Sequence, residues 1–304
     1  MTAPTITVIM LTYNREALVG NMIECILVQT FRDFEFIIVD NGSTDRSGAI
    51  ADEYAEKDER IRVIHRQKGN IGSGRNVGLD VASGEYVAFV DDDDVCEPDF
   101  LEFMLNLAVE NDADISICGA TDKALDERYV YTPEDAIVEL LWRKKFNVQF
   151  PTKLIRCKLF DKIRFSDTAK YDDIELMPQI LASANRIAYD GTPKYTFERH
   201  DGNNSAWTTN HSLLNAETLA EYLRVYRERT DWLSERFPNS AAIWRYFEWS
   251  FMISMVEKLA WLELADCYGL RDSMINELRH NRTEFSNCEY IQNFEREWLN
   301  AFGD

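Results

Sequence analysis

The sequence is short of basic residues. It has 33 Lys and Arg against 53 Asp and Glu, which gives a formal net charge of −20 at pH 7. A surface of this charge repels nucleic-acid phosphates and anionic lipid headgroups at long range. We therefore expect no nucleic-acid partner, although a local basic pocket could still hold a small phosphate.

Long apolar runs and paired cysteines are also missing. No window approaches the roughly 18 apolar residues that a membrane span needs. The N-terminal stretch MTAPTITVIMLTYNRE has no basic region and too short an apolar run for a signal peptide. The six cysteines are scattered, without a close pair at zinc-ligand or redox spacing, and indicate reduced, mostly buried thiols. These absences predict a cytoplasmic protein.

The sequence has instead a regular alternation of strand and helix patterns. With 304 residues, of which 45% are hydrophobic, the chain can bury a substantial core. The first third predicts strands over 5–11, 34–40, 61–66 and 85–91, with helices over 17–30, 43–57 and 72–83 between them. We expect the helix over 43–57 to be capped by Ser43 or Thr44. Near-continuous apolar strands in this order predict an α/β fold with a parallel sheet covered on both faces.

The pattern changes along the rest of the chain. A helix over 98–112 and a strand over 113–120 precede a mixed segment that extends to about 206. From about 211 strand signals disappear, and two long helical patterns follow. The second of them carries Trp244, Phe247, Phe251, Met255 and Leu262 along one face. We predict a helical C-terminal region over 211–304.

The carboxyl ends of the four predicted strands are all polar. They read TYNRE (12–16), DNGSTD (40–45), HRQKGNIGSGRN (65–76) and DDDD (91–94). In open α/β sheets, ligands bind in the crevice beyond these ends. We therefore expect the four stretches to converge on one site.

Four consecutive aspartates, Asp91 to Asp94, follow an apolar strand. In an extended segment, Asp91 and Asp93 would share one face, and Asp92 and Asp94 the other. Two carboxylates at a strand end suit Mg²⁺ or Mn²⁺, which prefer oxygen ligands and keep open positions for substrate phosphates. A solvated acidic loop is the alternative that this spacing leaves open.

Two other motifs fail at specific positions. An EF-hand loop that began at Asp91 would need Gly where Cys96 stands. A dinucleotide fingerprint in GNIGSGRNVG would need a third glycine at position 77, which is Val, and would belong in the first strand–helix turn.

Two further stretches fit a nucleotide ligand. Asp40 ends the second strand, where a carboxylate could accept the ring N–H of a uracil-like base. In KGNIGSGRNVG, glycines such as Gly74 allow close backbone approach, and Lys68 and Arg75 could neutralise phosphate charge. A capped turn and a flexible loop, both without a ligand, remain alternative interpretations of these two stretches.

Taken together, VIMLTYNRE, FIIVDNGSTDRS, GNIGSGRNVGLDVASGEYVAFVDDDDV and EPDFLE resemble the family 2 glycosyltransferases, inverting enzymes with a GT-A fold. The resemblance implies a mixed, mainly parallel sheet flanked by helices and a nucleotide-sugar donor. It implies that Asp40 binds uracil, that Thr12 and Asn14 line the nucleotide pocket, and that Asp91 to Asp93 form the Asp-x-Asp motif. The expected donor-binding residues are Thr12, Tyr13, Asn14, Glu16, Asp40, Asn41, Lys68, Gly74, Arg75, Asp91, Asp92 and Lys153.

The same resemblance extends to later segments. KYDDIELMPQIL is similar to the segment that supplies the catalytic base; this chain has Asp172 and Asp173 where relatives have Glu-Asp. The resemblance implies Asp173 as the base, with Asp172 and Arg199 on the acceptor side. The implied metal ligands are Asp93, Asp91 and His200, and the implied cofactor is Mn²⁺ or Mg²⁺.

We therefore predict an inverting, metal-dependent glycosyltransferase that moves a sugar from a nucleotide-diphosphate donor to an acceptor hydroxyl in surface glycan synthesis. UDP is the expected nucleotide of the donor. Residues 1–210 form the catalytic domain, with halves 1–95 and 96–210, and 211–304 the helical region. A glycan or lipid-linked glycan is the expected acceptor, at the inner face of the membrane. Peripheral membrane contact through Trp244, Trp249 and Trp261, or a homodimer, is a candidate role for the helices. A non-catalytic nucleotide-sugar or glycan-binding module is the alternative. A sugar-nucleotide pyrophosphorylase would need a Gly-rich loop directly after the first strand, and this sequence has none there.

Overall fold

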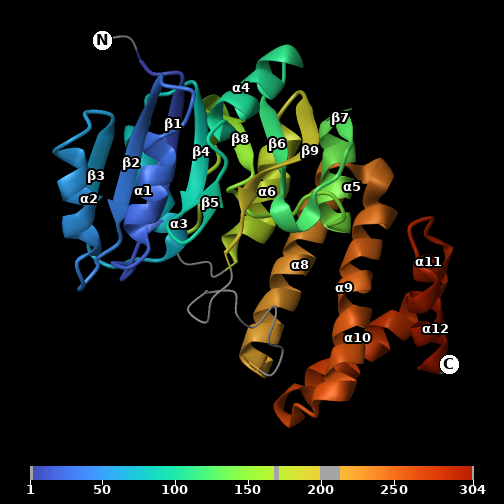
Figure 1. The fold of residues 1–304 in the computed structure, drawn as a ribbon. Coiled ribbons are helices and arrows are strands. Elements are labelled where there is room, and N and C mark those ends of the chain that lie inside the picture. The colour runs from blue at the N-terminus through green and yellow to red at the C-terminus, as the bar shows by residue number, and fades with distance from the viewer. Residues whose placement is uncertain (1–2, 168–170, 199–212, 303–304) are drawn as a thin grey trace. The chain divides into compact units, whose positions relative to one another are not determined.

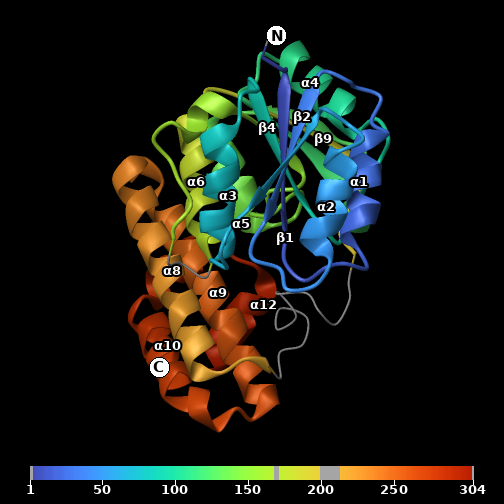
Figure 2. The same cartoon turned by 90° about the vertical axis from the view of Figure 1, so that its left-hand side faces the viewer.

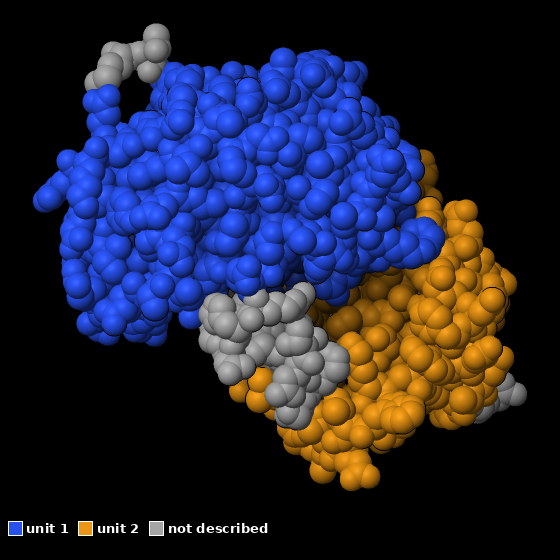
Figure 3. All heavy atoms as spheres, in the orientation of Figure 1, with its two compact units in different colours: residues 1–198 blue, residues 199–304 orange. Residues whose placement is uncertain are grey.

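The computed structural model describes residues 3–167, 171–198 and 213–302. The chain divides into two compact units, residues 1–198 and 199–304 (Figure 3). The predicted boundary at 210 lies outside the described residues, so the division at that position stays a prediction.

Unit 1 is built on a nine-stranded mixed sheet in the order β3-β2-β1-β4-β8-β6-β9-β5, with β7 paired to β9 (Figure 1). The first four strands are parallel to their neighbours, and β8 joins them antiparallel. The strands are β1 (Ile6–Thr12), β2 (Phe34–Asp40), β3 (Ile61–His65), β4 (Tyr86–Asp91), β5 (Val95–Cys96), β6 (Ile115–Ala120), β7 (Arg128–Tyr131), β8 (Lys153–Arg156) and β9 (Ile187–Thr196).

Helices cover both faces of this sheet. Figure 2 shows α1 and α2 on one face and α3 and α6 on the other. The helices of unit 1 are α1 (Val19–Leu27), α2 (Ser47–Ala55), α3 (Ile71–Val81), α4 (Phe100–Glu110), α5 (Pro133–Trp142) and α6 (Asp172–Ser183), with short 3₁₀ turns η1 (Thr121–Lys123) and η2 (Cys157–Phe160). The predicted fold class, a mixed sheet flanked by helices with a helical C-terminal region, is confirmed.

The apolar strands are buried because both faces of the sheet are covered. Ile6, Val8 and Met10 of β1 belong to the core that also holds Met22 and Ile26 of α1. Ile9 points to the opposite face and is 1% exposed. This two-sided burial explains why the strand sequences are apolar throughout instead of alternating.

Helix α2 begins later than the sequence predicts. It starts at Ser47, not at Ser43 or Thr44. The backbone N–H of Ser43 donates to Asp40 Oδ1 (2.9 Å), and that of Thr44 donates to Asn14 Oδ1 (2.8 Å). These residues tie two strand ends together, so they are not free to start the helix.

The aspartate run also departs from its predicted geometry. Strand β4 ends at Asp91, and the chain turns at Asp92 and Asp93. The side chains therefore do not alternate as they would in an extended segment, and that prediction is wrong.

Unit 2 is helical, with α8 (Ala216–Arg236), α9 (Ala241–Leu262), α10 (Tyr268–His280), α11 (Arg282–Asn287), α12 (Asn293–Ala301), and 3₁₀ turns η4 (Pro238–Ser240) and η5 (Ala265–Cys267). Trp244 and Trp249 are buried in its core, which excludes them from a membrane surface and corrects that part of the prediction. Trp261 is 84% exposed. Within the described parts of the chain, no helix has both the length and the apolarity to cross a bilayer.

Candidate active site

The carboxyl ends of the first four strands lie at one edge of the sheet. Thr12 of β1 pairs in register with Asp40 of β2, and Asp40 pairs with His65 of β3. On the other side of β1, Leu11 pairs with Asp91 of β4. The structure thus brings together the four polar stretches that the sequence analysis singled out.

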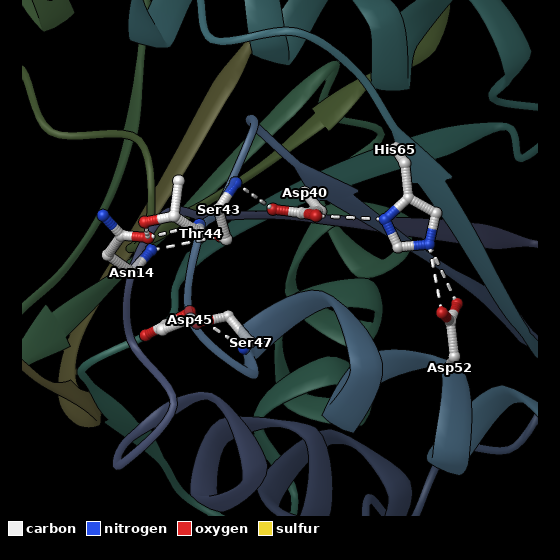
Figure 4. A network of polar contacts seen from close by, with 8 residues as sticks. All are labelled: Asn14, Asp40, Ser43, Thr44, Asp45, Ser47, Asp52 and His65. Carbon is white, nitrogen blue, oxygen red and sulfur yellow. Dashed lines mark hydrogen bonds and ion pairs between the residues drawn. The ribbon is translucent and has the colours of Figure 1, made fainter.

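The loops after β1 and β2 hold each other in place. Asn14 has a left-handed backbone (φ 53°), donates its N–H to Ser43 Oγ (3.1 Å) and accepts the N–H of Thr44 (Figure 4). Two residues on, Glu16 accepts the N–H of Arg46 (3.0 Å). Asn14 and Glu16, which are predicted to bind the nucleotide-sugar donor, therefore also hold the loop that follows Asp40 in place.

Asn41 and Lys68 connect these loops to the segment after β3. The Asn41 amide donates to the carbonyl of Gly69 (2.9 Å) and accepts its N–H (3.2 Å). Lys68 Nζ donates to the Tyr13 hydroxyl (2.9 Å) and lies 4.2 Å from the centre of that ring. Three strand ends are thus cross-linked into one polar framework.

Asp40 is buried, and both of its carboxylate oxygens have partners. Ser43 N–H donates to Oδ1, and Nδ1 of His65 lies 3.0 Å from Oδ2 (Figure 4). Burial opposes ionisation, but the hydrogen bonds from Ser43 and His65 outweigh it and lower the pKa of Asp40 below its ordinary value. The carboxylate is therefore held ionised and in one orientation.

Two arginines lie beside the aspartate run. Arg15 lies 3.8 Å from Asp92 and 3.6 Å from Asp93, and Arg75 lies 3.7 Å from Asp91. The Arg15 backbone N–H donates to Ser47 Oγ (2.7 Å), which fixes the start of this loop on α2. Arg15 stands within the TYNRE motif, but its position in the sequence does not predict this contact with the aspartates.

Asp94 is a structural anchor. It is buried, and its Oδ1 accepts the N–H of Glu198 (2.9 Å). The hydroxyl of Tyr195 accepts the N–H of Asp91 (3.1 Å), so the end of β9 is tied to the run at two points. Burial raises the pKa of Asp94 to about 8.

Asp173 lies at the start of α6, near Arg75. Burial raises the pKa of Asp173, and the charge of Arg75 opposes the rise. The Arg75 guanidinium is framed by Phe89, Phe150 and Phe165, with 5.0–5.7 Å between its central carbon and the ring centres. This frame aims one guanidinium at Asp91 while it acts electrostatically on Asp173.

Five other predicted site residues remain: two pack against other parts of unit 1, two lie outside the described residues, and one begins α6. Lys153 is fully buried on β8, its Nζ donates to the Gln149 carbonyl, and burial lowers its pKa to about 7. Gly74 packs against β1: a Cβ there would lie 2.5 Å from Leu11 Cδ2. Their contact with a donor stays a prediction. Arg199 and His200 fall outside the described residues, and Asp172 is the first residue of α6.

The aspartate run suits a cation that is shared with a substrate. In the described ranges no group of three or more His, Cys, Asp or Glu side chains converges as a metal-binding cluster. However, the buried Oδ2 of Asp92 and the buried hydroxyl of Thr12 make no hydrogen bond of good geometry among the described residues, although the hydroxyl is close enough to Asp92 to oppose the rise in its pKa. Burial raises the pKa of Asp92 to about 7, as expected for a carboxylate without full compensation. Hard oxygen donors with open positions fit Mg²⁺ or Mn²⁺ completed by phosphates.

Comparison with known proteins agrees with this geometry. The model of "Glycosyl transferase family 2" matches residues 7–168, more than half of the chain. Glycosyltransferase GlyG of Streptococcus pneumoniae is 34% identical over 215 residues, which cover 65% of this chain and 71% of that protein. Three longer curated relatives match this chain over smaller shares of their own lengths, namely 62%, 38% and 37%.

Two solved structures share the fold at low identity. S. aureus TarS 1–349 in complex with UDP-GlcNAc has a TM-score of 0.63 at 18% identity, over 98% of this chain and 91% of that chain. The mannosyltransferase PcManGT from Pyrobaculum calidifontis, in complex with GDP-Man and Mn²⁺, has a TM-score of 0.58 at 16% identity, over 99% of this chain and 85% of that chain. The fold is therefore the GT-A type, and the family model and GlyG agree on the class of protein. This chain belongs to glycosyl transferase family 2 and is a glycosyltransferase.

Proposed function

We propose that the chain transfers a sugar from a UDP-sugar to an acceptor hydroxyl with inversion at the anomeric carbon. One observation carries this proposal: Asp40 and Asp91 end strands at one edge of the sheet, and Arg75 of α3 contacts Asp91 and also acts on Asp173. A base-recognising carboxylate, a phosphate-neutralising cation and a general base are thereby available to one substrate. The UDP-GlcNAc complex of TarS supports UDP-sugars as the first donors to test.

In this proposal Asp173 acts as the general base. Its carboxylate takes the proton of the acceptor hydroxyl while that oxygen attacks the anomeric carbon. The bond from this carbon to the diphosphate oxygen breaks on the opposite side, and UDP leaves with the electron pair. The raised pKa of Asp173 makes it a stronger proton acceptor than an ordinary aspartate.

Other residues of the chain bind and orient the donor. Asp40 accepts the base N–H, and the framework of Asn14, Asn41 and Lys68 shapes the nucleotide pocket. Asp91 and Asp93 would hold Mn²⁺ or Mg²⁺, with His200 as a third ligand. Such an ion would supply electrostatic stabilisation of the charge that develops on the diphosphate. The Mn²⁺ in the PcManGT complex supports this assignment.

The acceptor side is less defined by the described residues. Family membership supports a glycan acceptor, free or lipid-linked, in surface polysaccharide synthesis. Asp172 and Arg199 are proposed to contact it. Exposed Trp261 remains a candidate for peripheral membrane contact at the inner face of the membrane, and the C-terminal helices for a homodimer.

A donor screen tests the proposed function. The purified chain is incubated with UDP-, GDP- and other nucleotide sugars, with Mn²⁺ or with EDTA, and release of the free nucleotide is measured. We expect release from a UDP-sugar with Mn²⁺ and loss of release with EDTA. Preference for a GDP-sugar would overturn the UDP assignment. UDP binding without release from any donor would favour the non-catalytic binding module.

A further inference from the structure

His65, which the sequence analysis left without a role, bridges two carboxylates. It is the last residue of β3, beside the last residue of β2, Asp40. Its Nδ1 lies 3.0 Å from Asp40 Oδ2, and its Nε2 lies 3.0 Å and 3.2 Å from the two carboxylate oxygens of Asp52 on α2 (Figure 4). The imidazole ring thus connects a strand end to a helix.

Both ring nitrogens must donate in this arrangement. Carboxylates only accept hydrogen bonds, and a neutral imidazole has a single N–H donor. The doubly protonated imidazolium is the form that satisfies both contacts. Consistent with this, the hydrogen bonds to Asp40 and Asp52 raise the pKa of His65 above its ordinary value. Asp40 from β2 and Asp52 from α2 are the charged groups that act on the ring.

Gly48 allows α2 to close over this pair. A Cβ at position 48 would lie 2.5 Å from Asp40 Oδ2 and 3.1 Å from Cε1 of His65. The helix backbone therefore approaches the carboxylate and the ring more closely than any other residue type would allow. The Asp40 end of the bridge is therefore packed beneath α2, whereas the ring of His65 and Asp52 are half exposed.

Asp40 keeps acceptor capacity for a ligand. Ser43 acts on Asp40 through both its backbone N–H and its hydroxyl, and His65 occupies one lone-pair site on Oδ2. A carboxylate offers about four such sites. Three donors from two residues can therefore fix its orientation and leave one acceptor site for a base N–H.

We propose that protonated His65 is the positioning residue for Asp40, and that nucleotide binding is consequently linked to protonation of this ring. The inference rests on the proposed function, because it takes Asp40 as the acceptor for a base that presents a ring N–H. Loss of the ring proton leaves one donor for two carboxylates, so one side of the bridge opens, the ring no longer ties Asp40 to α2, and any remaining contact to Asp40 lacks the charge of the imidazolium. The chain therefore binds its nucleotide more tightly below the pKa of His65 than above it.

Calorimetric titration with UDP tests the linkage on the full chain between about pH 5.5 and about pH 8.5, either side of the ordinary histidine pKa. The comparison is between wild type and His65→Gln, which retains one donor but cannot be charged. We expect wild type to bind roughly fivefold to tenfold more tightly at the acid end, the scale of the difference between a charge-assisted and a neutral hydrogen bond. The ratio falls toward one at the alkaline end. Ionisation of the nucleotide is common to both proteins and cancels in the ratio.

Asp52→Asn is the second variant. Asp52 lies on α2 and is half exposed, and the substitution removes one of the two charges that stabilise the imidazolium. We expect the transition in UDP affinity to persist but to move to lower pH, a shift that a merely structural role of His65 does not produce. Thermal unfolding of each variant checks that it is folded.

The outcomes separate the two proposals. Wild type that binds UDP with an affinity ratio of one at every pH overturns the role of His65 and leaves the proposed function standing. A ratio that is constant but above one, or an unmoved transition in Asp52→Asn, overturns the proton linkage. Wild type that binds no UDP overturns both proposals.

Discussion

The four aspartates at the end of β4 fall into three environments. Asp91 faces Arg75, Asp92 and Asp93 lie beside Arg15, and Asp94 anchors the backbone of Glu198. Among the described residues, the first three are close to basic side chains. Like charges are tolerated here because two arginines lie beside the first three aspartates, and because Asp94 accepts a backbone hydrogen bond from Glu198.

At the residue scale, the Asp40–His65 pair predicts how stability depends on pH. The pKa of His65 is raised in the folded chain, so its contribution is complete below the unfolded value of about 6.5 and disappears as pH rises through the raised value. The pKa of Asp40 is lowered, so its contribution is complete above about 3.9 and disappears as pH falls through the lowered value. Both contributions are complete between about pH 4 and about pH 6.5.

We therefore expect His65→Gln to lower the free energy of unfolding most in that window. The ring is half exposed, so solvent screening limits the loss to about 1 kcal/mol or less. Urea unfolding of both proteins at about pH 5.5 and about pH 9 measures it. A difference that grows toward alkaline pH would contradict the assignment of the charged ring.

Sequence reasoning at this scale identifies residue types better than partners. It singles out Asp40, Arg75 and the aspartates because they follow apolar strands. It has no means to foresee Arg15 or His65, since their partners come from other loops and helices. Likewise Cys25 and Cys96, scattered in sequence, place their sulfurs 3.2 Å apart.

At the scale of the element, the fold follows from sequence where burial is two-sided. Strand β2 spans the predicted residues 34–40, because an apolar run between two helices has one way to be buried. Pairing order is not encoded in such runs: short β5 and β7 and the antiparallel insertion of β8 depend on contacts far along the chain. The late start of α2 depends on side-chain bonds between loops.

Gly48 gives a prediction about how α2 is seated. Gly48→Ala places a Cβ 2.5 Å from Asp40 Oδ2, and we expect a loss of roughly 1–3 kcal/mol in unfolding free energy together with weaker UDP binding. Gly20→Ala is a matched control, since both glycines are the second residue of a nine-residue helix. At Gly20 the nearest atom lies 3.7 Å away, so alanine is expected to be neutral or to stabilise by up to about 1 kcal/mol.

Denaturant unfolding and UDP titration of the two variants provide the measurement. Equal stability of Gly48→Ala and Gly20→Ala would show that α2 can move away from the strand ends without cost. The close approach of α2 would then have no part in holding the Asp40–His65 pair.

At the scale of the whole molecule, a net charge of −20 opposes the binding of an anionic donor. The strand-end site adds further carboxylates, so Arg15 and Arg75 alone do not reverse the local sign. A divalent cation held by Asp91 and Asp93 would offset the negative charge of the site's carboxylates and that of the donor diphosphate. Metal dependence is thus expected from the charge of the molecule as well as from the aspartate motif.

Asp93→Ala tests this expectation. We expect weaker binding of a UDP-sugar and slower turnover, each by roughly tenfold or more, as for loss of a charged ligand contact. Added Mn²⁺ should recover part of the loss, because Asp91 remains. Asp126→Ala, which removes an exposed aspartate elsewhere in unit 1, is the control for net charge. The same loss in both variants would assign the effect to overall charge.

The most direct test of the account compares wild type with Asp173→Asn, measuring UDP affinity and the rate of sugar transfer on the same preparations. Asparagine keeps the shape of the side chain but cannot take up the acceptor proton. The account predicts UDP affinity within about twofold of wild type and a transfer rate reduced by roughly 10²–10⁴-fold, the scale of general base catalysis. Transfer at the wild-type rate by Asp173→Asn would contradict the assignment of the base, and with it the proposed mechanism.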